Sequence, residues 1–175
     1  RKGNELYFGF RKVSPDNHTS MVRNVFSSVA GSYDLMNDLM SGGLHRLWKT
    51  FLLDRLNPRA NDFLLDVAGG TGDIAEGYLK RGGGAAAICD INTEMLAAGV
   101  NRSLDRGNIG GAFRICGDAA ALPIPDGIAD ACTIVFGLRT VARRHAALGG
   151  SDPTVKTGGQ LICMQFSPAI LPEVK

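Results

Sequence analysis

The sequence lacks an excess of charge of either sign. It has 19 Lys and Arg residues against 17 Asp and Glu, a formal net charge of +2. That balance excludes a nucleic-acid binder that works by electrostatic attraction alone. No apolar run reaches the ~18 residues that cross a bilayer, so the sequence shows no candidate membrane-spanning helix.

Cysteine and clustered metal ligands are scarce too. The cysteines lie far apart, with no Cys-x-x-Cys pair and no His/Cys cluster, which argues against a disulfide framework and against a zinc site. Each falls in an apolar, strand-like stretch. We therefore predict no bound metal, and buried thiols at Cys89, Cys116, Cys132 and Cys163.

Glycine, by contrast, is abundant: it supplies 23 of the 175 residues, about 13% against a usual ~7%. Hydrophobic residues make up 45% of the chain and charged residues 21%, proportions that exclude intrinsic disorder. The length fits one globular unit and leaves little room for a second.

Apolar periodicity divides the chain into two parts. Residues 1–60 are predicted to form an N-terminal arm, over the first fifteen residues, and a helical cap. The clearest helical stripe of the cap runs from Leu44 to Leu56 and includes Trp48, which we expect in the core. Residues 61–175 alternate short apolar runs with helical stretches, which is typical of an α/β three-layer sandwich on a parallel sheet. The expected strands are 63–67, 85–89, 113–116, 131–136 and 160–166.

The strongest local signal is a buried strand that runs into a glycine-rich turn, Leu64-Leu65-Asp66-Val67-Ala68-Gly69-Gly70-Thr71-Gly72-Asp73. Such a turn lets a ligand approach the backbone closely and presents N–H groups at a helix start to an anionic part of it. The plainer alternative is that the glycines pack a helix against a strand and the aspartates cap helices.

Two further carboxylates follow the next two strands. Asp90 ends the second strand, where it can accept hydrogen bonds from both ribose hydroxyls of an adenosine. Asp118 follows the third strand, where it can meet the adenine edge. Since the carboxyl ends of parallel strands share the edge at which open α/β sheets bind ligands, Asp66, Asp90 and Asp118 together predict a nucleoside-containing ligand there.

Two cofactors compete for this arrangement. A dinucleotide would put its pyrophosphate against the turn, and Gly70-x-Gly72-x-x-Ala75 loosely fits that fingerprint, but Asp73 would then face a phosphate of like charge. S-adenosylmethionine has a cationic ammonium and a cationic sulfonium, which suit Asp66 and Asp73, and a carboxylate that suits the N–H groups of the turn. We favour S-adenosylmethionine.

Beyond the glycine turn, the sequence resembles the ubiquinone/menaquinone biosynthesis C-methyltransferases of the UbiE type, from Tyr7 to about Phe166. The glycine motif alone indicates only a class I methyltransferase. The specific segments are Tyr33-Asp34-Leu35-Met36-Asn37-Asp38 and His45-Arg46-Leu47-Trp48-Lys49. Supporting segments are Phe8-Gly9-Phe10, Val25–Ala30, Cys89–Asn92, Ala121-Leu122-Pro123 and Phe136-Gly137-Leu138-Arg139.

The resemblance implies a Rossmann-like class I methyltransferase fold and S-adenosylmethionine-dependent methylation of a ring carbon. The implied substrate is a polyprenylated benzoquinol or naphthoquinol of ubiquinone or menaquinone biosynthesis. Tyr33 and Arg139 are assigned to the substrate, and Arg139 is the predicted catalytic residue. The expected cofactor contacts are Asp66, Gly69, Thr71, Gly72, Asp90, Ile91, Asp118 and Ala119.

Such a substrate keeps its isoprenoid tail in the bilayer, so the resemblance also implies peripheral membrane contact. The site of action would be the cytoplasmic face of the inner membrane in a bacterium, or the matrix side of the inner membrane in a mitochondrion. Other quinone-biosynthesis proteins and a second copy in a homodimer are further partners to consider, and nucleic acid is not. Two alternatives stay open: a methyltransferase for another small acceptor, and a non-catalytic S-adenosylmethionine-binding scaffold subunit.

The sequence departs from the family pattern in three places. Thr140 stands where the family usually has Asn, and Val135 stands where it usually has Ser. The stretch 149–154 contains two glycines and a proline, which cannot hold the continuous helix that the family carries there. The sequence also ends before the antiparallel strand pair that completes such a sheet, so we expect the core to be incomplete at its C-terminus.

Overall fold

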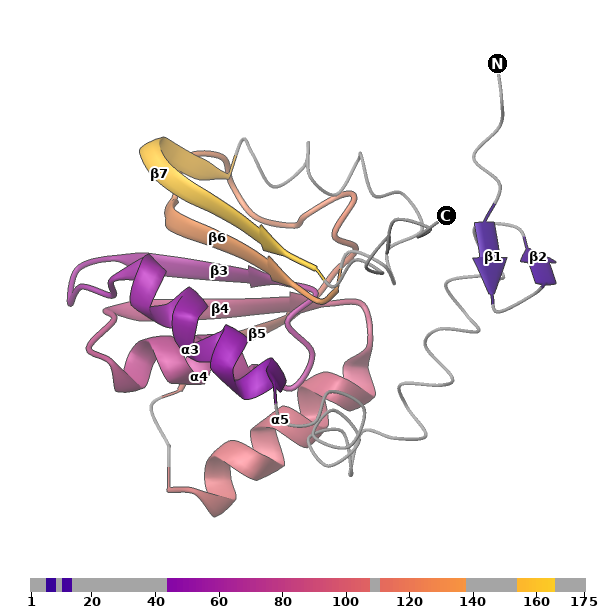
Figure 1. Ribbon diagram of the computed structural model, residues 1–175, viewed down its shortest axis with the longest axis horizontal. Coiled ribbons are helices and arrows are strands. Elements are labelled where there is room, and N and C mark those ends of the chain that lie inside the picture. Colours follow the sequence, from indigo (N-terminus) through magenta and orange to yellow (C-terminus); the bar gives the residue numbers. More distant parts are fainter. Residues whose placement is uncertain (1–5, 9–10, 14–43, 108–110, 138–153, 166–175) are drawn as a thin grey trace, which may run out of the picture.

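The computed structural model describes residues 6–8, 11–13, 44–107, 111–137 and 154–165. Its main body is a sheet in the order β5-β4-β3-β6-β7, in which every neighbouring pair is parallel (Figure 1). The strands are β3 (Phe63–Val67), β4 (Ala85–Asp90), β5 (Phe113–Cys116), β6 (Ala129–Val135) and β7 (Val155–Met164). The parallel α/β sheet predicted from the sequence is confirmed.

The order of the strands determines where a ligand can bind. The chain runs outward from β3 to β4 and β5, then returns to the other side of β3 with β6 and β7. The strand order therefore reverses between β3 and β6, and the crevice outside the carboxyl ends at such a switch point is the usual ligand site of an open α/β sheet. All the predicted site residues from Asp66 to Ala119 lie in or just after the carboxyl ends of β3, β4 and β5.

The central strands read as continuous apolar runs because both of their faces are covered. Leu64 and Ile88 belong to a hydrophobic cluster on one face of the sheet, whereas Leu65 and Cys89 belong to a second cluster on the other face. Asp66 alternates with Leu65 and Val67, so its side chain lies on the same face as Leu64.

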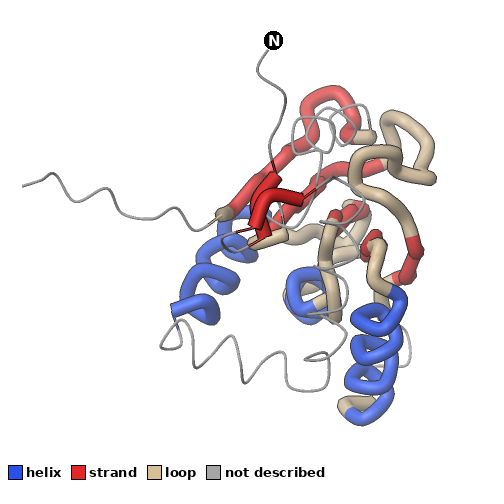
Figure 2. The backbone as a smooth tube through the Cα atoms, turned by 90° about the vertical axis from the view of Figure 1, so that its right-hand side faces the viewer, coloured by secondary structure: helices blue, strands red, loops and turns tan. Residues whose placement is uncertain are grey.

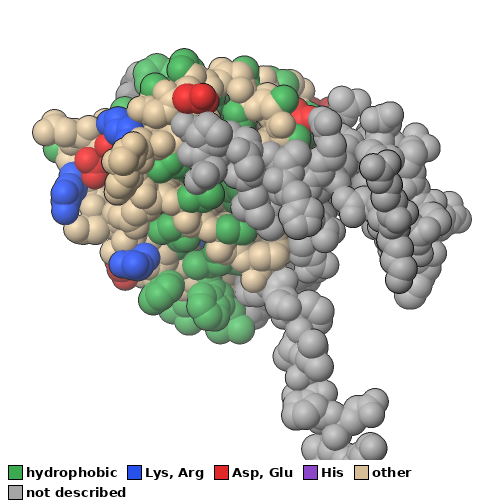
Figure 3. Space-filling view, turned by 90° about the horizontal axis from the view of Figure 1, so that it is seen from above, with side chains coloured by type: hydrophobic (Ala, Val, Ile, Leu, Met, Phe, Trp, Pro, Cys, Tyr) green, Lys and Arg blue, Asp and Glu red, His purple; other side chains and the backbone are tan. Residues whose placement is uncertain are grey.

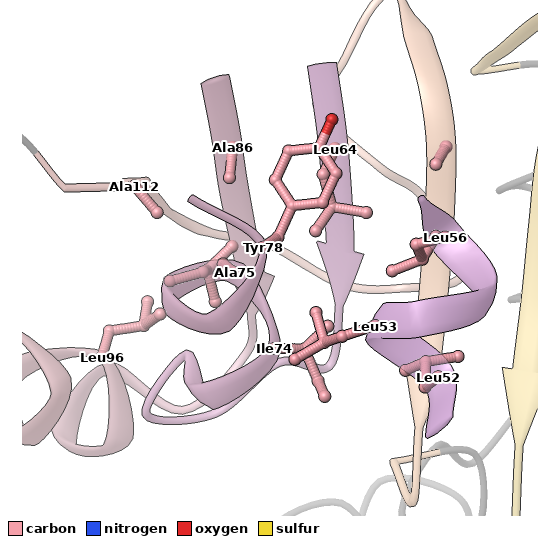
Figure 4. Packing of buried hydrophobic residues seen from close by; sticks show 12 residues of the cluster. Leu52, Leu53, Leu56, Leu64, Ile74, Ala75, Tyr78, Ala86, Leu96 and Ala112 are labelled. Carbon is pink, nitrogen blue, oxygen red and sulfur yellow. The ribbon is translucent and has the colours of Figure 1, made fainter. Parts of the chain in front are cut away.

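Helices cover the face that carries Asp66. These are α3 (Leu44–Leu56), α4 (Asp73–Lys80) and α5 (Thr93–Asp105). Their buried side chains meet Leu64 and Ala86 of the sheet in one cluster (Figure 4), and the tube view shows the helices gathered beside the strands (Figure 2). The cluster contains Leu52, Leu53 and Leu56 of α3, Ile74, Ala75 and Tyr78 of α4, and Leu96 of α5. The opposite cluster is closed by the segment after β5, through Ala119, Leu122 and Ile124.

The predicted N-terminal arm contains two short strands, β1 (Leu6–Phe8) and β2 (Arg11–Val13), paired antiparallel. Three-residue strands are too short to show a hydrophobic period in the sequence. The part of the predicted helical cap that precedes Leu44, and residues 149–153 of the stretch that departs from the family pattern, lie outside the described residues.

Two expectations about burial were wrong. Cys89 and Cys132 are buried as predicted, but Cys116 and Cys163 are exposed. The exposed pair belongs to β5 and β7, the outermost strands of the described sheet, whereas the buried pair belongs to inner strands. Trp48 is also not a core residue, since it is 46% exposed on α3.

Candidate cofactor site

Left-handed backbone shapes the turn after β3. Ala68 has a φ of 53°, Gly70 of 57° and Gly72 of 89°. Gly69 is constrained by space: a Cβ there would lie 2.6 Å from Oδ2 of Asp66. The glycine-rich motif is therefore required both by the backbone conformation and by the close approach of the turn to the Asp66 carboxylate.

Asp66 is the most unusual charged group of the described structure. Its side chain is 1% exposed, and Oδ1 accepts a 2.8 Å hydrogen bond from the hydroxyl of Thr133 on β6. Oδ2 is buried without a hydrogen-bond partner. Burial raises the pKa of Asp66 to about 7, and the nearby Asp73 and Asp90 carboxylates add to the rise, while Thr133 and Lys49 oppose it. A buried oxygen of this kind is costly to leave unpaired, so its position beside the glycine turn indicates a ligand with a cationic donor.

Asp90 is held by the backbone at the end of β4. Oδ2 accepts a 2.8 Å hydrogen bond from the N–H of Gly70, and Oδ1 accepts one of 2.8 Å from the N–H of Asn92. Burial raises the pKa of Asp90 above its ordinary value, although the backbone donors oppose that shift. The backbone of Ile91 also donates to Asp90. Since the two carboxylate oxygens together have about four lone pairs, three backbone donors leave room for a ligand hydroxyl.

The segments after Asp90 and after β5 provide the adjoining surface. Ile91 is 43% exposed although it is a large aliphatic residue, so it offers an apolar surface beside the Asp90 carboxylate. Asp118 accepts a 2.8 Å hydrogen bond from the N–H of Ala120 through Oδ1, which fixes the turn that contains the buried Ala119. An apolar platform beside a carboxylate turn suits the adenine of a nucleoside.

The turns after β3 and β6 pack against each other at the switch point. Phe136, like Ala68, follows its strand with a positive φ, here 58°. A Cβ at Gly137 would lie 2.6 Å from the Cβ of Ala68. The Phe136-Gly137 part of the family motif therefore borders the glycine turn. Tyr33 and Arg139, the predicted substrate residues, lie outside the described residues.

Asp73 does not have the position that the sequence suggested for it. Instead of being available to a cationic ligand, its carboxylate forms ion pairs with Lys49 of α3, at 2.5 Å, and with Arg102 of α5. Burial opposes the ionisation of Asp73, but the two cations outweigh it and hold the pKa of Asp73 below its ordinary value. Of the two carboxylates assigned to the cations of S-adenosylmethionine, Asp66 therefore remains.

Sequence reasoning missed three residues that shape the site: Thr133, Lys49 and Arg102. Arg102 donates a 3.2 Å hydrogen bond to the carbonyl of the buried Thr71, besides its ion pair with Asp73. Lys49 is the last residue of the His-Arg-Leu-Trp-Lys segment. That segment supported the family resemblance, but it assigned no role to Lys49. Thr133 and Arg102 carry no local signal, since only the sheet register and the packing of α5 bring them to the turn.

The described residues fit S-adenosylmethionine better than a dinucleotide. The buried, unpartnered oxygen of Asp66 requires a donor or a cation, which the α-ammonium of the cofactor supplies and a pyrophosphate does not. Among the described residues there is no group of three or more His, Cys, Asp or Glu side chains that could hold a metal ion.

The burial of Asp66 predicts a pH-dependent stability. Because its pKa in the folded protein, about 7, lies above the unfolded value of 3.8, the folded state holds the proton more tightly. The stabilisation is complete below about pH 4 and is lost as the pH rises through 7. Thermal unfolding without ligand should show that Asp66→Asn gains stability relative to the wild type between pH 5 and pH 8, by roughly 2 kcal/mol. Parallel pH profiles for the two proteins would contradict the buried, unpaired carboxylate.

Comparisons with known proteins identify one family. The model of the ubiE/COQ5 methyltransferase family matches residues 13–175. The ubiquinone/menaquinone biosynthesis C-methyltransferase UbiE of Rhodopseudomonas palustris (strain BisB5) is 46% identical, over 97% of this chain and 69% of its own length. UbiE of Paracoccus denitrificans is 45% identical, over 96% of this chain and 68% of its own length.

Solved structures share the fold at lower identity. A putative methyltransferase in complex with the Trm112 activator of Haloferax volcanii matches with a TM-score of 0.67 and 20% identity, over 79% of this chain and 58% of its own. A putative S-adenosyl-L-methionine-dependent methyltransferase of Methanococcus maripaludis matches with a TM-score of 0.62 and 14% identity, over 90% and 66%. These likenesses confirm the Rossmann-like fold of class I methyltransferases. The family match over nearly the whole sequence, together with the UbiE relatives, shows that this chain belongs to the ubiE/COQ5 methyltransferase family.

Proposed function

We propose that the chain methylates a ring carbon of a polyprenylated benzoquinol or naphthoquinol, with S-adenosylmethionine as the methyl donor. The observation that carries the proposal is the unpartnered buried oxygen of Asp66 beside the glycine turn, in a chain of this family. The quinone-biosynthesis names of the relatives supply the substrate class.

The described residues divide the binding of the cofactor among three turns. Asp66 would hold the ammonium through Oδ2, and Asp90 would hold the ribose hydroxyls. Ile91, Asp118 and Ala119 would hold the adenine. The cofactor supplies an electrophilic methyl group on a sulfonium. The chain holds it at the carboxyl edge of the sheet, where the buried strands below exclude water.

Carbon methylation also requires electron density at the ring carbon. Arg139 remains protonated at all accessible pH values, so it is not a base. Its guanidinium can hold the quinol oxygen as a phenolate once the hydroxyl proton has passed to water, which raises the nucleophilicity of the adjacent carbon. Methyl transfer would release S-adenosylhomocysteine, and loss of the ring proton to water would restore the aromatic ring. Arg139 follows β6, which ends at Val135, and the intervening Gly137 packs against Ala68 at the switch point. Tyr33 would contact the same substrate.

Membrane contact through α3 would give access to the isoprenoid tail. Leu44, Leu47, Trp48 and Phe51 are exposed and follow one another at helical spacing, while Leu52, Leu53 and Leu56 face the core. The helix also exposes Arg46 and Arg55. Figure 1 shows α3 in front of the sheet. In Figure 3, which views the molecule from above, hydrophobic side chains gather at the lower edge of the described surface. Aromatic and basic residues on one exposed helix are typical of an interfacial helix on an anionic lipid surface. Within the described residues, no helix is long and apolar enough to cross a bilayer.

The direct test of this function is methyl transfer in vitro. The full chain, given isotope-labelled S-adenosylmethionine and a short-chain demethylated quinol, should place the label on a ring carbon, as judged by mass spectrometry. Cofactor binding without transfer to any quinol would favour the scaffold alternative. Transfer only to other acceptors would favour the methyltransferase with a different substrate.

The ribose contact of Asp90 predicts that Asp90→Ala loses more affinity for a ligand with a 2′-hydroxyl than for one without it. The wild type should bind S-adenosylhomocysteine about tenfold more tightly than its 2′-deoxy analogue, because a hydrogen bond to a charged group contributes roughly 1.5–3 kcal/mol. Asp90→Ala should bind both ligands with nearly equal affinity in calorimetric titrations. The comparison of ligands is needed because Asp90 also accepts from Gly70 and Asn92, so the variant loses stability as well. A preference for the ribose hydroxyl that survives in Asp90→Ala would refute the assignment.

The phenolate role predicts that Arg139→Lys slows turnover about a hundred- to a thousandfold, while the affinity for S-adenosylmethionine barely changes. Lysine keeps the charge but loses the two-pronged geometry of the guanidinium. Arg81→Lys is the control, because Arg81 pairs with Asp54 on an exposed surface. Turnover of Arg139→Lys within twofold of the control would show that Arg139 has no catalytic role.

The exposed face of α3 predicts binding to liposomes. In flotation assays at low salt the full chain should rise with anionic vesicles, and Phe51→Ser should reduce the bound fraction about tenfold, since burying such a side chain contributes roughly 1.5–3 kcal/mol. Phe113→Ser is the matched control, because Phe113 is 68% exposed on β5 and Phe51 is 60% exposed on α3. Equal binding of the two variants would contradict a lipid-facing α3.

A further inference from the structure

A cluster of three charged side chains joins three helices beside the glycine turn. Lys49 comes from α3, Asp73 begins α4, and Arg102 comes from α5. The Nζ of Lys49 lies 2.5 Å from Oδ2 of Asp73, and Arg102 pairs with Oδ1. The side chains of Lys49 and Asp73 are only 18% and 22% exposed, so this pair is partly shielded from solvent. The cofactor contacts proposed above assign no role to Lys49.

The acidic side chains at the start of α4 are bound to partners away from the N–H groups of its first turn. Gly72, the cap residue, makes no side-chain cap hydrogen bond, and the first turn contains two acidic residues, Asp73 and Glu76. Both are engaged elsewhere: Asp73 by Lys49 and Arg102, and Glu76 by the hydroxyl of Ser103 at 2.6 Å. No carboxylate of this turn is therefore free to fold back onto its N–H groups.

An acidic side chain of this turn, if released from its partners, would fold back onto the N–H groups at the start of α4. Carboxylates bind readily to the N–H groups and the positive dipole end of a helix N-terminus. The carboxylate of S-adenosylmethionine would then compete with a side chain of the protein for the same donors. A released Asp73 would also no longer be offset by Lys49, the cation of α3 that favours the ionised forms of both Asp66 and Asp73.

We propose that Lys49 is a positioning residue for the cofactor: together with Arg102, it holds Asp73 away from the glycine turn and so keeps the N-terminus of α4 open for the carboxylate of S-adenosylmethionine. The inference rests on the cofactor site of the proposed function, but it does not depend on the quinol. It makes α3 part of the cofactor site through an ion pair, although Lys49 itself need not contact the ligand.

The chain offers a matched control for this ion pair. Arg81 caps the other end of α4 and pairs with Asp54 of α3, with 2.7 Å between Nη1 and Oδ1. The two ion pairs therefore join the same two helices, one beside the glycine turn and one at the far end of α4. A purely structural role predicts similar consequences for their loss, whereas the positioning role predicts a change in affinity only at Lys49.

The experiment is calorimetric titration of S-adenosylhomocysteine into the full chain and its variants, with circular dichroism to verify folding. Lys49→Met should weaken binding about tenfold, the scale expected when a carboxylate competes for a helix N-terminus. Arg81→Met should remain within twofold of the wild type, and Lys49→Arg should restore most of the affinity. In a background carrying Asp73→Asn, the further change Lys49→Met should have almost no effect, because the competing carboxylate is gone.

The outcomes separate this inference from the function on which it rests. If the wild type binds and Lys49→Met binds as Arg81→Met does, the inference is wrong and the cofactor site stands. If Lys49→Met weakens binding equally with and without Asp73→Asn, Lys49 acts directly on the ligand and not through Asp73, which also overturns it. If the wild type binds no S-adenosylhomocysteine, the proposed function fails and the inference with it. Should Lys49→Met not fold, Lys49→Gln replaces it in the same cycle.

Discussion

A buried carboxylate with one unpaired oxygen is the constraint on which the site depends. Asp66 lies in the central strand of a parallel sheet, below a turn so close that Gly69 has no room for a side chain. Thr133 on the neighbouring strand satisfies one oxygen, and the other has no partner. The fold therefore stores an unfavourable electrostatic state that a cationic ligand can relieve. That state explains why the ligand should be an ammonium-bearing cofactor rather than a pyrophosphate.

Cations and backbone N–H groups bind two of the three carboxylates around the glycine turn. Three carboxylates, Asp66, Asp73 and Asp90, lie around one turn, but only Asp73 is held by ion pairs. Asp90 is fixed by backbone N–H groups, which leaves its remaining lone pairs for hydroxyls. In the proposed site, Asp66 would thus accept from an ammonium and Asp90 from a ribose, beside the N-terminus of α4. Helix α3 links this arrangement to the surface, since it carries Lys49 between its core face and its exposed apolar face.

Much of this could be predicted from the sequence, because the signals were local. Short apolar runs gave the strands: the prediction for 63–67 matches β3, and that for 113–116 matches β5. The order of Asp66, Asp90 and Asp118 after successive strands gave the edge of the sheet at which they meet. The partners of Asp73 could not be predicted, because Lys49 and Arg102 lie 24 and 29 residues away on helices whose packing no local pattern encodes. Trp48 was misplaced because α3 has apolar residues on two faces, and a periodic pattern does not say which face is buried.

The central claim, that Asp66 keeps an unpaired oxygen for the ammonium of the cofactor, is tested most directly by following its carboxyl group. Carbon-13 NMR of protein labelled at the aspartate carboxyls, assigned by the signal missing from Asp66→Asn, gives the pKa of this group with and without S-adenosylhomocysteine. The account predicts a pKa near 7 in the free protein, and a clear fall when the ligand binds, because the ammonium favours the ionised form. An ordinary aspartate pKa in the free protein, or a raised one that the ligand leaves unchanged, would contradict it.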